Sequence, residues 1–315
     1  MALRRLAFNL VGLGLIGAPL TLALAGLSGV GHRWIDVLAQ FTAPALAATI
    51  LLGLGFLLIR RRRWAAAAAA VVILLLAVVW PQWFPPVGRA EPGAPVIRLY
   101  SANLFYLNND AAAIRRSIVA ADPDIVVLIE LARRPAADLD RMLAGYPHRV
   151  VSVRTDDVRG LSRSVVASRY PLTEVPGRAD GLHDVTAVIR TPLGRLNVVG
   201  VHLTRPWPYQ YQWSQINQAS ALAAVRGDLT GPVIVAGDFN SISSARIGRQ
   251  VQRETGLVPA PGFPGTWPAA LPSAFGMTID QVYRTPDLAL VSRKLGRPTG
   301  SDHRPVVIEI TRAAD

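Results

Sequence analysis

The sequence lacks cysteine altogether and has a single lysine, Lys294, among its 33 basic residues. Without cysteine the chain has no disulfide, no thiolate metal site and no cysteine nucleophile, and this absence is compatible with any compartment. The net charge of +12 therefore comes almost entirely from arginine. No dense stripe of arginine and aromatic residues occurs outside the apolar N-terminal third, so we attribute the charge to compositional bias rather than to a nucleic-acid partner.

Acidic residues are scarce at the N-terminus, where residues 1–94 contain only two, against eight arginines. The same region contains uncharged apolar runs from 6 to 30 and from 37 to 59, and a shorter one from 64 that ends in aromatic residues by 84. A membrane-spanning helix needs about 20 apolar residues, and tryptophan and phenylalanine are typical of the membrane interface. The sequence therefore predicts a membrane anchor, residues 1–84, with three transmembrane helices at about 6–30, 37–59 and 64–84.

The arginines predict the orientation of this anchor. Arg4 and Arg5 precede the first run, and four consecutive arginines, 60–63, separate the second run from the third. By the positive-inside rule the N-terminus and the arginine loop are cytoplasmic, so the C-terminal part of the chain lies outside the cytoplasmic membrane. A cleaved signal peptide is the alternative for the first run, but its length and the two runs behind it favour a retained helix.

A linker rich in proline and glycine, residues 85–95, separates the anchor from a globular domain at 96–315. Short apolar runs that suit buried strands alternate there with segments of helical spacing, and "TPLG" is typical of a hairpin turn. Hairpins mixed with strand–helix units indicate an α+β fold rather than a purely parallel sheet.

Polar residues mark the ends of the predicted strands at six places. Asparagine, aspartate, glutamate or histidine follows or precedes an apolar run at each of them: Asn103, Glu130, His202, Asp238 with Asn240, Asp280, and Asp302 with His303. One such residue alone is usually a turn or cap residue, but six sites can converge on one edge of a fold. Carboxylate and carboxamide oxygens suit Mg²⁺, Mn²⁺ or Ca²⁺. Histidines beside carboxylates suit acid–base chemistry, and the combination indicates hydrolysis at phosphorus.

These segments occur in the order of the motifs of a known family. They read "SANL", "DIVVLIEL", "ASRYPL", "VHLTRP", "AGDFNS", "TIDQVY" and "SDHRPV", and they cover residues 96–312. The sequence resembles the endonuclease/exonuclease/phosphatase superfamily, which contains DNase I-like nucleases, sphingomyelinases and inositol polyphosphate 5-phosphatases. The resemblance implies a four-layer α/β/β/α sandwich with the site at one end. The added anchor resembles a membrane-bound bacterial branch that includes teicoplanin-resistance-associated proteins.

The resemblance also implies which residues hold the metal ion. Glu130 is expected to be the principal ligand, and Asn103 and Asp302 are expected to hold the metal or its water molecules. The expected cofactor is a divalent cation, with Mg²⁺ favoured over Mn²⁺ or Ca²⁺.

The remaining five residues are expected to perform the reaction. Asp238 is expected to orient or deprotonate the attacking water, and Asn240 to contact the scissile phosphate. His303, oriented by Asp280, is expected to stabilise the pentacovalent phosphorane. His202 is expected either to bind phosphate or to act as the general acid.

The sequence thus predicts a membrane-anchored phosphoesterase that cleaves a phosphate ester, phosphodiester or pyrophosphate. A domain tied to the outer face of the membrane favours a lipid-linked substrate, although the superfamily uses one type of site for several substrates. A surface nuclease acting on DNA or RNA is the alternative, and it predicts a basic, aromatic-lined groove. A non-catalytic binding domain is a third hypothesis, and it predicts that one of the expected residues is missing, whereas all are present. The sequence indicates no particular protein partner.

Overall fold

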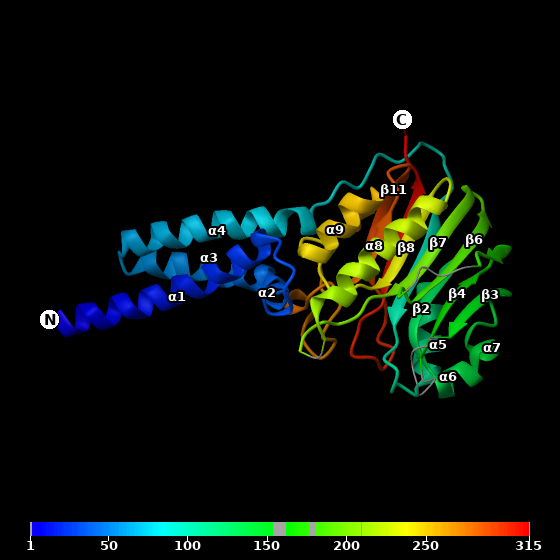
Figure 1. Cartoon of the computed structure of the whole chain (residues 1–315), viewed down its shortest axis with the longest axis horizontal. Helices are drawn as coiled ribbons and strands as arrows, with labels where there is room; N and C mark the ends of the chain where they lie inside the picture. Colours follow the sequence, from blue (N-terminus) through cyan, green and yellow to red (C-terminus); the bar gives the residue numbers. More distant parts are fainter. Residues whose placement is uncertain (1, 154–161, 177–180, 209, 315) are drawn as a thin grey trace.

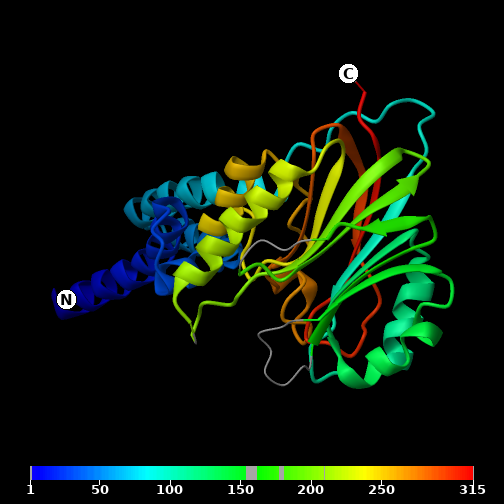
Figure 2. The ribbon, with the colours of Figure 1, turned by 45° about the vertical axis from the view of Figure 1, so that its right-hand side comes forward.

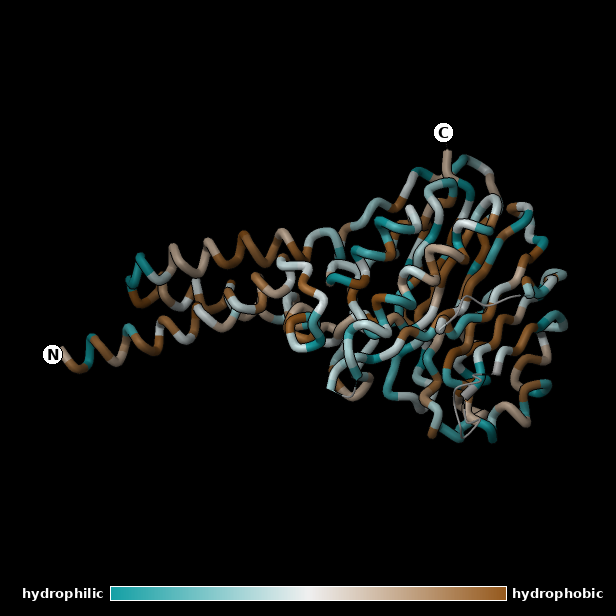
Figure 3. The backbone as a smooth tube through the Cα atoms, viewed as in Figure 1, coloured by the Kyte–Doolittle hydropathy of each residue, from teal (hydrophilic) through white to brown (hydrophobic). Residues whose placement is uncertain are grey.

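The structure of the chain, a computed structural model, describes residues 2–153, 162–176, 181–208 and 210–314. Residues before 84 form a long helical bundle, and the residues after it form a β-sandwich at one end of that bundle (Figure 1). The bundle is apolar along most of its length and hydrophilic where its third helix joins its fourth (Figure 3). In keeping with the expectations from the sequence, we call the bundle the anchor and the sandwich the catalytic domain.

The anchor consists of four helices, α1 (Ala2–Ser28), α2 (Arg33–Ala39), α3 (Thr42–Leu58) and α4 (Arg62–Trp83). Helices α1 and α4 are each long and apolar enough to cross a membrane. Helices α2 and α3 meet at a bend of 53° and make a third candidate span only if they are taken together. Two or three spans are thus compatible with the structure, against the three expected.

The second span differs from the expectation of an unbroken run at 37–59. The chain breaks between α2 and α3, because Asp36 and Gln40 are buried there and hydrogen-bond to each other, Gln40 Nε2 to Asp36 Oδ2, at 3.2 Å. These polar side chains lie against the catalytic domain, so the first turns of the expected span belong to the junction instead.

The catalytic domain contains two six-stranded sheets packed face to face. The strands of sheet one are β1 (Ile97–Asn103), β2 (Ile125–Ala132), β3 (His148–Val153), β4 (Ser162–Ser168), β11 (Leu288–Leu295) and β12 (Val306–Arg312). Their order across the sheet is β11-β12-β1-β2-β4-β3.

Sheet two is built from the middle of the chain. Its strands are β5 (Leu172–Glu174), β6 (Asp184–Thr191), β7 (Gly194–His202), β8 (Val233–Asp238), β9 (Val258–Pro259) and β10 (Asp280–Arg284). Their order is β5-β6-β7-β8-β10-β9. Each sheet contains one parallel pair, β1 with β2 and β7 with β8, and its other pairs are antiparallel.

Helices cover the outer face of each sheet (Figure 2). On sheet one these are α5 (Ala111–Ala121), α6 (Arg133–Ala137) and α7 (Leu139–Met142), and on sheet two α8 (Gln212–Asp228) and α9 (Arg246–Thr255). A single turn of 3₁₀-helix, η1 (Ser273–Phe275), precedes β10.

Three apolar clusters hold these layers together. One lies between the sheets, where residues such as Leu99 and Val127 of sheet one meet Val198 and Ile234 of sheet two. A second cluster packs α5 and α7 on sheet one, and a third packs α8 and α9 on sheet two. The strand pattern of alternating apolar residues thus fills the inner face of each sheet. The α+β class and the four-layer α/β/β/α sandwich expected from the sequence are confirmed.

The linker, residues 85–95, is hydrogen-bonded to the catalytic domain. Arg284 donates a hydrogen bond to the carbonyl of Pro86, Leu290 N donates to the carbonyl of Val87, and Glu91 N donates to the carbonyl of Arg312. The linker therefore runs along β11 and β12 at the edge of sheet one.

Three hydrogen bonds to backbone carbonyls also connect the anchor helices to the catalytic domain. Arg249 of α9 donates to the carbonyl of Gly26 at the end of α1, at 2.7 Å. Arg33 of α2 donates to the carbonyl of Gln210, at 3.0 Å. Gly262 N donates to the carbonyl of Gln82 in α4, at 2.7 Å. Three of the four anchor helices are thus tied to the sandwich.

Candidate active site

The two parallel strand pairs end at the same end of the sandwich, and polar side chains follow each strand there. Asn103 ends β1, Glu130 lies near the end of β2, His202 ends β7 and Asp238 ends β8. The carboxyl ends of parallel strands are where open sheets generally bind ligands. Asp280 joins them because β10 runs antiparallel to β8 and begins directly opposite Asp238.

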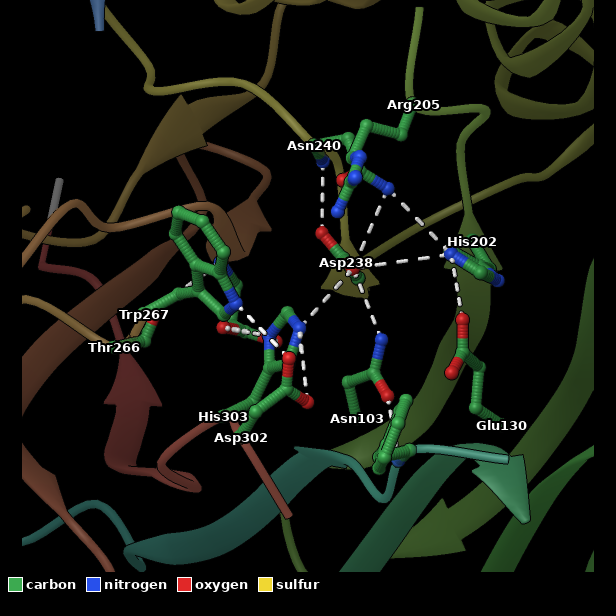
Figure 4. A network of polar contacts seen from close by, with 12 residues as sticks. Asn103, Glu130, His202, Arg205, Asp238, Asn240, Thr266, Trp267, Asp302 and His303 are labelled. Carbon is green, nitrogen blue, oxygen red and sulfur yellow. Dashed lines mark hydrogen bonds and ion pairs between the residues drawn. The ribbon is translucent and has the colours of Figure 1, made fainter. Parts of the chain in front are cut away.

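Asp238 is at the centre of this group, with a histidine on either side (Figure 4). Its Oδ2 atom accepts a hydrogen bond from Asn103 Nδ2 at 2.9 Å, and its Oδ1 atom accepts one from the backbone N–H of Asn240 at 2.8 Å. Burial, opposed by the charge of His303 and assisted by the carboxylates of Asp280 and Glu130, raises the pKa of Asp238 to about 7. Asp238 is therefore suited to accept a proton near neutral pH.

His303 and Asp280 form a buried pair beside Asp238. His303 Nδ1 lies 2.9 Å from Asp280 Oδ2, which leaves Nε2 facing Asp238 Oδ2 at 4.0 Å. Burial alone would lower the pKa of His303, but the charges of Asp280, Asp238 and Asp302 and the hydrogen bond to Asp280 raise it to about 10. His303 is thus held as a cation at neutral pH, with one N–H directed at the site.

A second histidine–carboxylate pair lies on the opposite side of Asp238. His202 Nε2 is 3.3 Å from Glu130 Oε1, 3.8 Å from Asp238 Oδ2 and 3.5 Å from Asn240 Nδ2. The other oxygen of Glu130 accepts a hydrogen bond from the backbone of Tyr106 at 3.2 Å. His202 therefore bridges the residues of the two sheets.

Two site residues have a backbone conformation that side chains other than glycine rarely adopt. Glu130 has a φ of 55° and lies where the pairing of β2 with β4 shifts register between Leu128 and Leu131. Asn240 has a φ of 47° directly after β8. Such strain persists only where the surroundings enforce it, and a bulge commonly re-aims a side chain near a site. Both residues are positioned by local backbone distortion.

Gly237 allows β7 and β8 to approach closely next to the site. Its φ is 148°, and a Cβ atom on this residue would lie 1.9 Å from the carbonyl oxygen of Val201. The following pair in the register is His202 with Asp238. Only glycine fits here, which explains why a glycine interrupts the apolar run just before Asp238.

These residues surround an open pocket of about 570 Å³. Seven of the eight residues expected from the sequence line it, and Asp280 supports His303 from behind. The pocket also has lining residues that were not expected: Phe105, Tyr106, Thr204, Arg205 and Gln210. Arg205 had a signal in the sequence, because it lies three residues after His202 within the "VHLTRP" motif.

Asp302 lies at the pocket edge, and its side chain is 48% exposed. Its Oδ2 atom accepts a hydrogen bond from Trp267 Nε1 at 3.1 Å, and the Trp267 ring packs beside His303 with 6.4 Å between ring centroids. Next to Trp267, the Thr266 hydroxyl accepts from the backbone N–H of Asp280 at 3.3 Å. The segment "GTWPA" thus supports both members of the His303–Asp280 pair.

The charge of the pocket fits a divalent cation. When Asp238 is ionised, four carboxylates, those of Glu130, Asp238, Asp280 and Asp302, face two cations, His303 and Arg205, and the formal surplus is two negative charges. A different group, Asp238, Asp280 and His303, also has donor atoms within 4.8 Å of one another. Asp280 and His303 already hydrogen-bond to each other, so we regard these three residues as acid–base groups rather than as metal ligands. The predicted metal ligands are still Glu130, Asn103 and Asp302.

Comparison with known proteins agrees with this geometry. The sequence profile of the endonuclease/exonuclease/phosphatase family matches residues 100–303, which is more than half of the chain. Among proteins of curated function, none matches the sequence.

Solved structures share the fold of the catalytic domain. An endonuclease/exonuclease/phosphatase from Beutenbergia cavernae is 20% identical, with a TM-score of 0.54 over 70% of this chain and 72% of that one. Sphingomyelinase C from Streptomyces griseocarneus is 16% identical, with a TM-score of 0.52 over 69% and 99%. D. rerio TDP2, complexed with a single-stranded DNA product, is 16% identical, with a TM-score of 0.54 over 69% and 99%. At these identities the likeness concerns the fold, and the family profile decides membership. The chain belongs to the endonuclease/exonuclease/phosphatase family, whose members hydrolyse phosphate esters.

Proposed function

We propose that this chain is a membrane-anchored, metal-dependent phosphoesterase whose substrate is a lipid-linked phosphate at the outer face of the cytoplasmic membrane. One observation carries the chemistry: Asp238 lies between two histidines, and each histidine is paired with a carboxylate of its own. This arrangement provides a proton acceptor flanked by proton donors within one pocket, which is what hydrolysis requires.

Asp238 is the group that activates water in this proposal. Its two oxygens are held by Asn103 and by the backbone of Asn240, so one lone pair can be directed at a water molecule in the pocket. A pKa near 7 makes the carboxylate basic enough to take the proton as the oxygen attacks phosphorus.

Cationic and amide donors around Asp238 stabilise the negative charge that grows on the phosphoryl oxygens. His303 offers Nε2–H, and Asp280 keeps the ring charged and oriented. Arg205 and Asn240 line the same pocket and supply further donors. Donors fixed before the reaction stabilise such charge without a cost of reorganisation. His202 is the remaining candidate to bind phosphate or to protonate the leaving oxygen.

The metal ion is assigned to Glu130, Asn103 and Asp302, which all line the pocket. When bound there, Mg²⁺ would neutralise charge on the phosphate and polarise the phosphorus–oxygen bond. The oxygen-only donor set and the surplus of negative charge favour Mg²⁺ over zinc, which prefers nitrogen and sulfur ligands.

The distribution of arginine along the anchor supports an outward-facing catalytic domain. Arg4 and Arg5 lie beside residues 60–63 and Trp64 around one hollow of the bundle, at the end away from the sandwich (Figure 1). Basic residues gather on the cytoplasmic side of membrane proteins. The opposite end of the bundle, which carries the catalytic domain, is then outside.

The position of the pocket supports a lipid-linked substrate. Gln210, a lining residue, is bonded through its carbonyl to Arg33 of the anchor. The Arg33 guanidinium also lies over the rings of Trp34 and Tyr211, with 5.3 Å and 5.2 Å to the centroids. Trp34, Tyr211 and the nearby Trp213 are 49%, 75% and 69% exposed. Exposed aromatic and basic side chains next to membrane helices are typical of the interfacial layer. This surface, which we call the aromatic rim and which adjoins the pocket at Gln210, would therefore lie at the level of lipid headgroups.

The proposal is tested with the full chain in detergent or nanodiscs. Product release is measured with Mg²⁺ for a lipid pyrophosphate, a sphingomyelin-type lipid, single-stranded DNA and double-stranded DNA, with Asp238→Ala as the control. We expect turnover of lipid and none by the control protein. Turnover of DNA alone would replace the lipid substrate by nucleic acid, and turnover of neither, in a folded protein, would contradict the enzymatic proposal.

A further inference from the structure

The end of the anchor near the catalytic domain contains two buried glutamines. Gln40 lies between α2 and α3 and is 1% exposed, and Gln82 lies in the last turn of α4 and is 3% exposed. Glutamine is rarely buried unless it is hydrogen-bonded, and both residues find their partners in the catalytic domain. Gln40 Oε1 accepts from the backbone N–H of Ile242 at 2.9 Å, and Gln82 Oε1 accepts from the hydroxyl of Ser244 at 3.3 Å.

Ile242 and Ser244 belong to the segment that connects β8 to α9, residues 239–245. We call it the Asn240 loop, because it begins one residue after Asp238 and contains Asn240. This loop belongs to no helix or β-strand, so its buried backbone N–H and C=O groups need hydrogen-bond partners from other parts of the chain. Gln215 Nε2 donates to the carbonyl of Phe239 at 2.9 Å, and Gln281 Nε2 donates to the carbonyl of Ser241 at 3.4 Å.

Four glutamines therefore hydrogen-bond to the backbone of this loop, because Gln252 Nε2 of α9 also donates to the carbonyl of Ser243, at 2.7 Å. Gln215 comes from α8 and Gln281 from β10, both in the catalytic domain, whereas Gln40 comes from the anchor, 202 residues away from its partner. The backbone of Asn240 is left-handed, a conformation that holds only while its surroundings enforce it. The contact with Gln40 lies two residues beyond this strained position.

Apolar contacts exclude water from the same junction. Ala39, next to Gln40, is 2% exposed and packs in a cluster with Ile242, Ala245, Met277 and Ile279 of the catalytic domain. A hydrogen bond inside such a cluster has no water to replace it when it is lost. Removal of the Gln40 side chain would leave the Ile242 N–H buried without a partner, and the loop would shift to satisfy it.

We propose that Gln40 is a positioning residue for Asn240, so that the anchor is a structural part of the active site rather than only a tether. The Asn240 side chain donates to the carbonyl of Leu203 at 2.8 Å and lies 3.5 Å from His202 Nε2. A shift of the loop would move this amide relative to both histidines and Asp238. The inference rests on the proposed function in one respect, the contact of Asn240 with the scissile phosphate.

The test compares three variants of the full chain. Gln40→Ala removes the acceptor for Ile242 N–H. The double variant Asp36→Asn/Gln40→Glu restores it, because the carboxylate at 40 accepts from Ile242 and from the new amide at 36, and the pair keeps a single negative charge. Thr49→Ala is the matched control, because Thr49 is a buried polar residue whose hydroxyl donates to the carbonyl of Ala45 within α3.

Two readouts are measured for each protein: the hydrolysis of a small soluble phosphodiester, and hydrogen–deuterium exchange of the Asn240 loop. We expect Gln40→Ala to lower kcat by about tenfold with little change in KM, since the lost interaction acts in the transition state. Its loop amides should exchange faster than those of the parent, whereas the double variant and Thr49→Ala should resemble the parent in both readouts.

Different results would contradict the positioning role of Gln40 and the proposed phosphoesterase function. Unchanged loop exchange in Gln40→Ala overturns the positioning role, whatever the activity. An equal loss of activity in Thr49→Ala also overturns it, because the effect would then come from general damage to the anchor. If the parent protein hydrolyses no phosphate ester, the proposed function fails, and faster exchange in Gln40→Ala alone would still support the structural link between anchor and loop.

Discussion

His303 Nδ1 lies 2.9 Å and 3.1 Å from the two carboxylate oxygens of Asp280, and this buried pair fixes both the charge and the direction of the imidazole. The other ring nitrogen, Nε2, is farther from its carboxylate neighbours, at 3.9 Å from Asp302 and 4.0 Å from Asp238. Asp280 lies at the start of β10 and His303 before β12, so the pair also joins the two sheets at the site.

The first prediction concerns this pair. Asp280→Asn keeps the shape of the side chain but removes the charge that holds His303 protonated, and we expect kcat to fall by about 100-fold. Hydrolysis of a soluble phosphodiester by the full chain measures the effect. Asp110→Asn is the control, since Asp110 caps α5 outside the pocket. Full activity in Asp280→Asn would show that His303 needs no carboxylate partner.

The second prediction concerns the metal ion. Chelation of divalent cations should abolish hydrolysis, and added Mg²⁺ should restore it. Glu130→Gln loses the charge of the proposed principal ligand. It should raise the Mg²⁺ concentration for half-maximal activity by more than about tenfold, because even the loss of a residue that only supports a metal ligand costs about tenfold or more in metal affinity. Glu174→Gln, in the short strand β5, should match the parent protein. Activity that persists in the chelator would refute the proposed cofactor.

The third prediction concerns the close approach of β7 and β8. Gly237→Ala places a Cβ atom against the carbonyl of Val201, so we expect a large loss of stability, by about 3 kcal/mol or more, together with loss of activity. Thermal unfolding and hydrolysis measure the two effects. Gly227→Ala is the matched control, because that glycine lies in α8 with open space around the position of an added methyl group and should be neutral or stabilising. Equal melting temperatures for both variants would contradict this interpretation.

The fourth prediction concerns the aromatic rim. The double variant Tyr211→Ala/Trp213→Ala removes two exposed rings at the start of α8, and we expect the KM for a lipid substrate in vesicles to rise by about tenfold, as for partial loss of an interfacial contact. The kcat for a small soluble ester should stay as in the parent. Phe275→Ala, an equally exposed aromatic residue in η1, serves for comparison. Parallel losses on both substrates would instead indicate a role in folding.

The fifth prediction concerns orientation, and the absence of cysteine makes it simple to test. A single cysteine at the exposed Ala274 should react with a membrane-impermeant maleimide on intact cells. A single cysteine at Arg61, between α3 and α4, should react only after the membrane is permeabilised. The reverse pattern would place the catalytic domain in the cytoplasm and would remove the argument for an outer-face substrate.

Much of the sandwich and of its site was predictable from the sequence because the information is local. Glu130, His202 and Asp238 each follow a continuous apolar run, and a buried strand followed by a polar residue is visible without a structure. The pairing of Asp280 with His303 was expected only through the resemblance to a family. The structure then supplied what no local pattern contains, the 2.9 Å contact between residues from two sheets.

The junction between anchor and catalytic domain was not predictable in the same way. Gln40 occurs within an apolar run, where an isolated polar residue carries no sign of a partner 202 residues later. Hydropathy alone extends the second helix through this position, whereas the structure bends the chain there to bury the side chain. Gln210 lies in a loop with no periodicity and outside the quoted motifs, so only the folded pocket shows that it lines the site.

The three contacts at Gly26, Arg33 and Gln82 have a consequence for how the enzyme would meet its substrate. A domain on a flexible linker samples many distances from the bilayer. A domain that is hydrogen-bonded to its anchor at three points keeps its pocket at a constant distance from the bilayer. If the anchor is embedded in a membrane, the distance between a phosphate and the lipid tail that carries it would then determine which substrates reach the pocket. The enzyme would select phosphates at one distance from the membrane over phosphates held closer to it or farther from it.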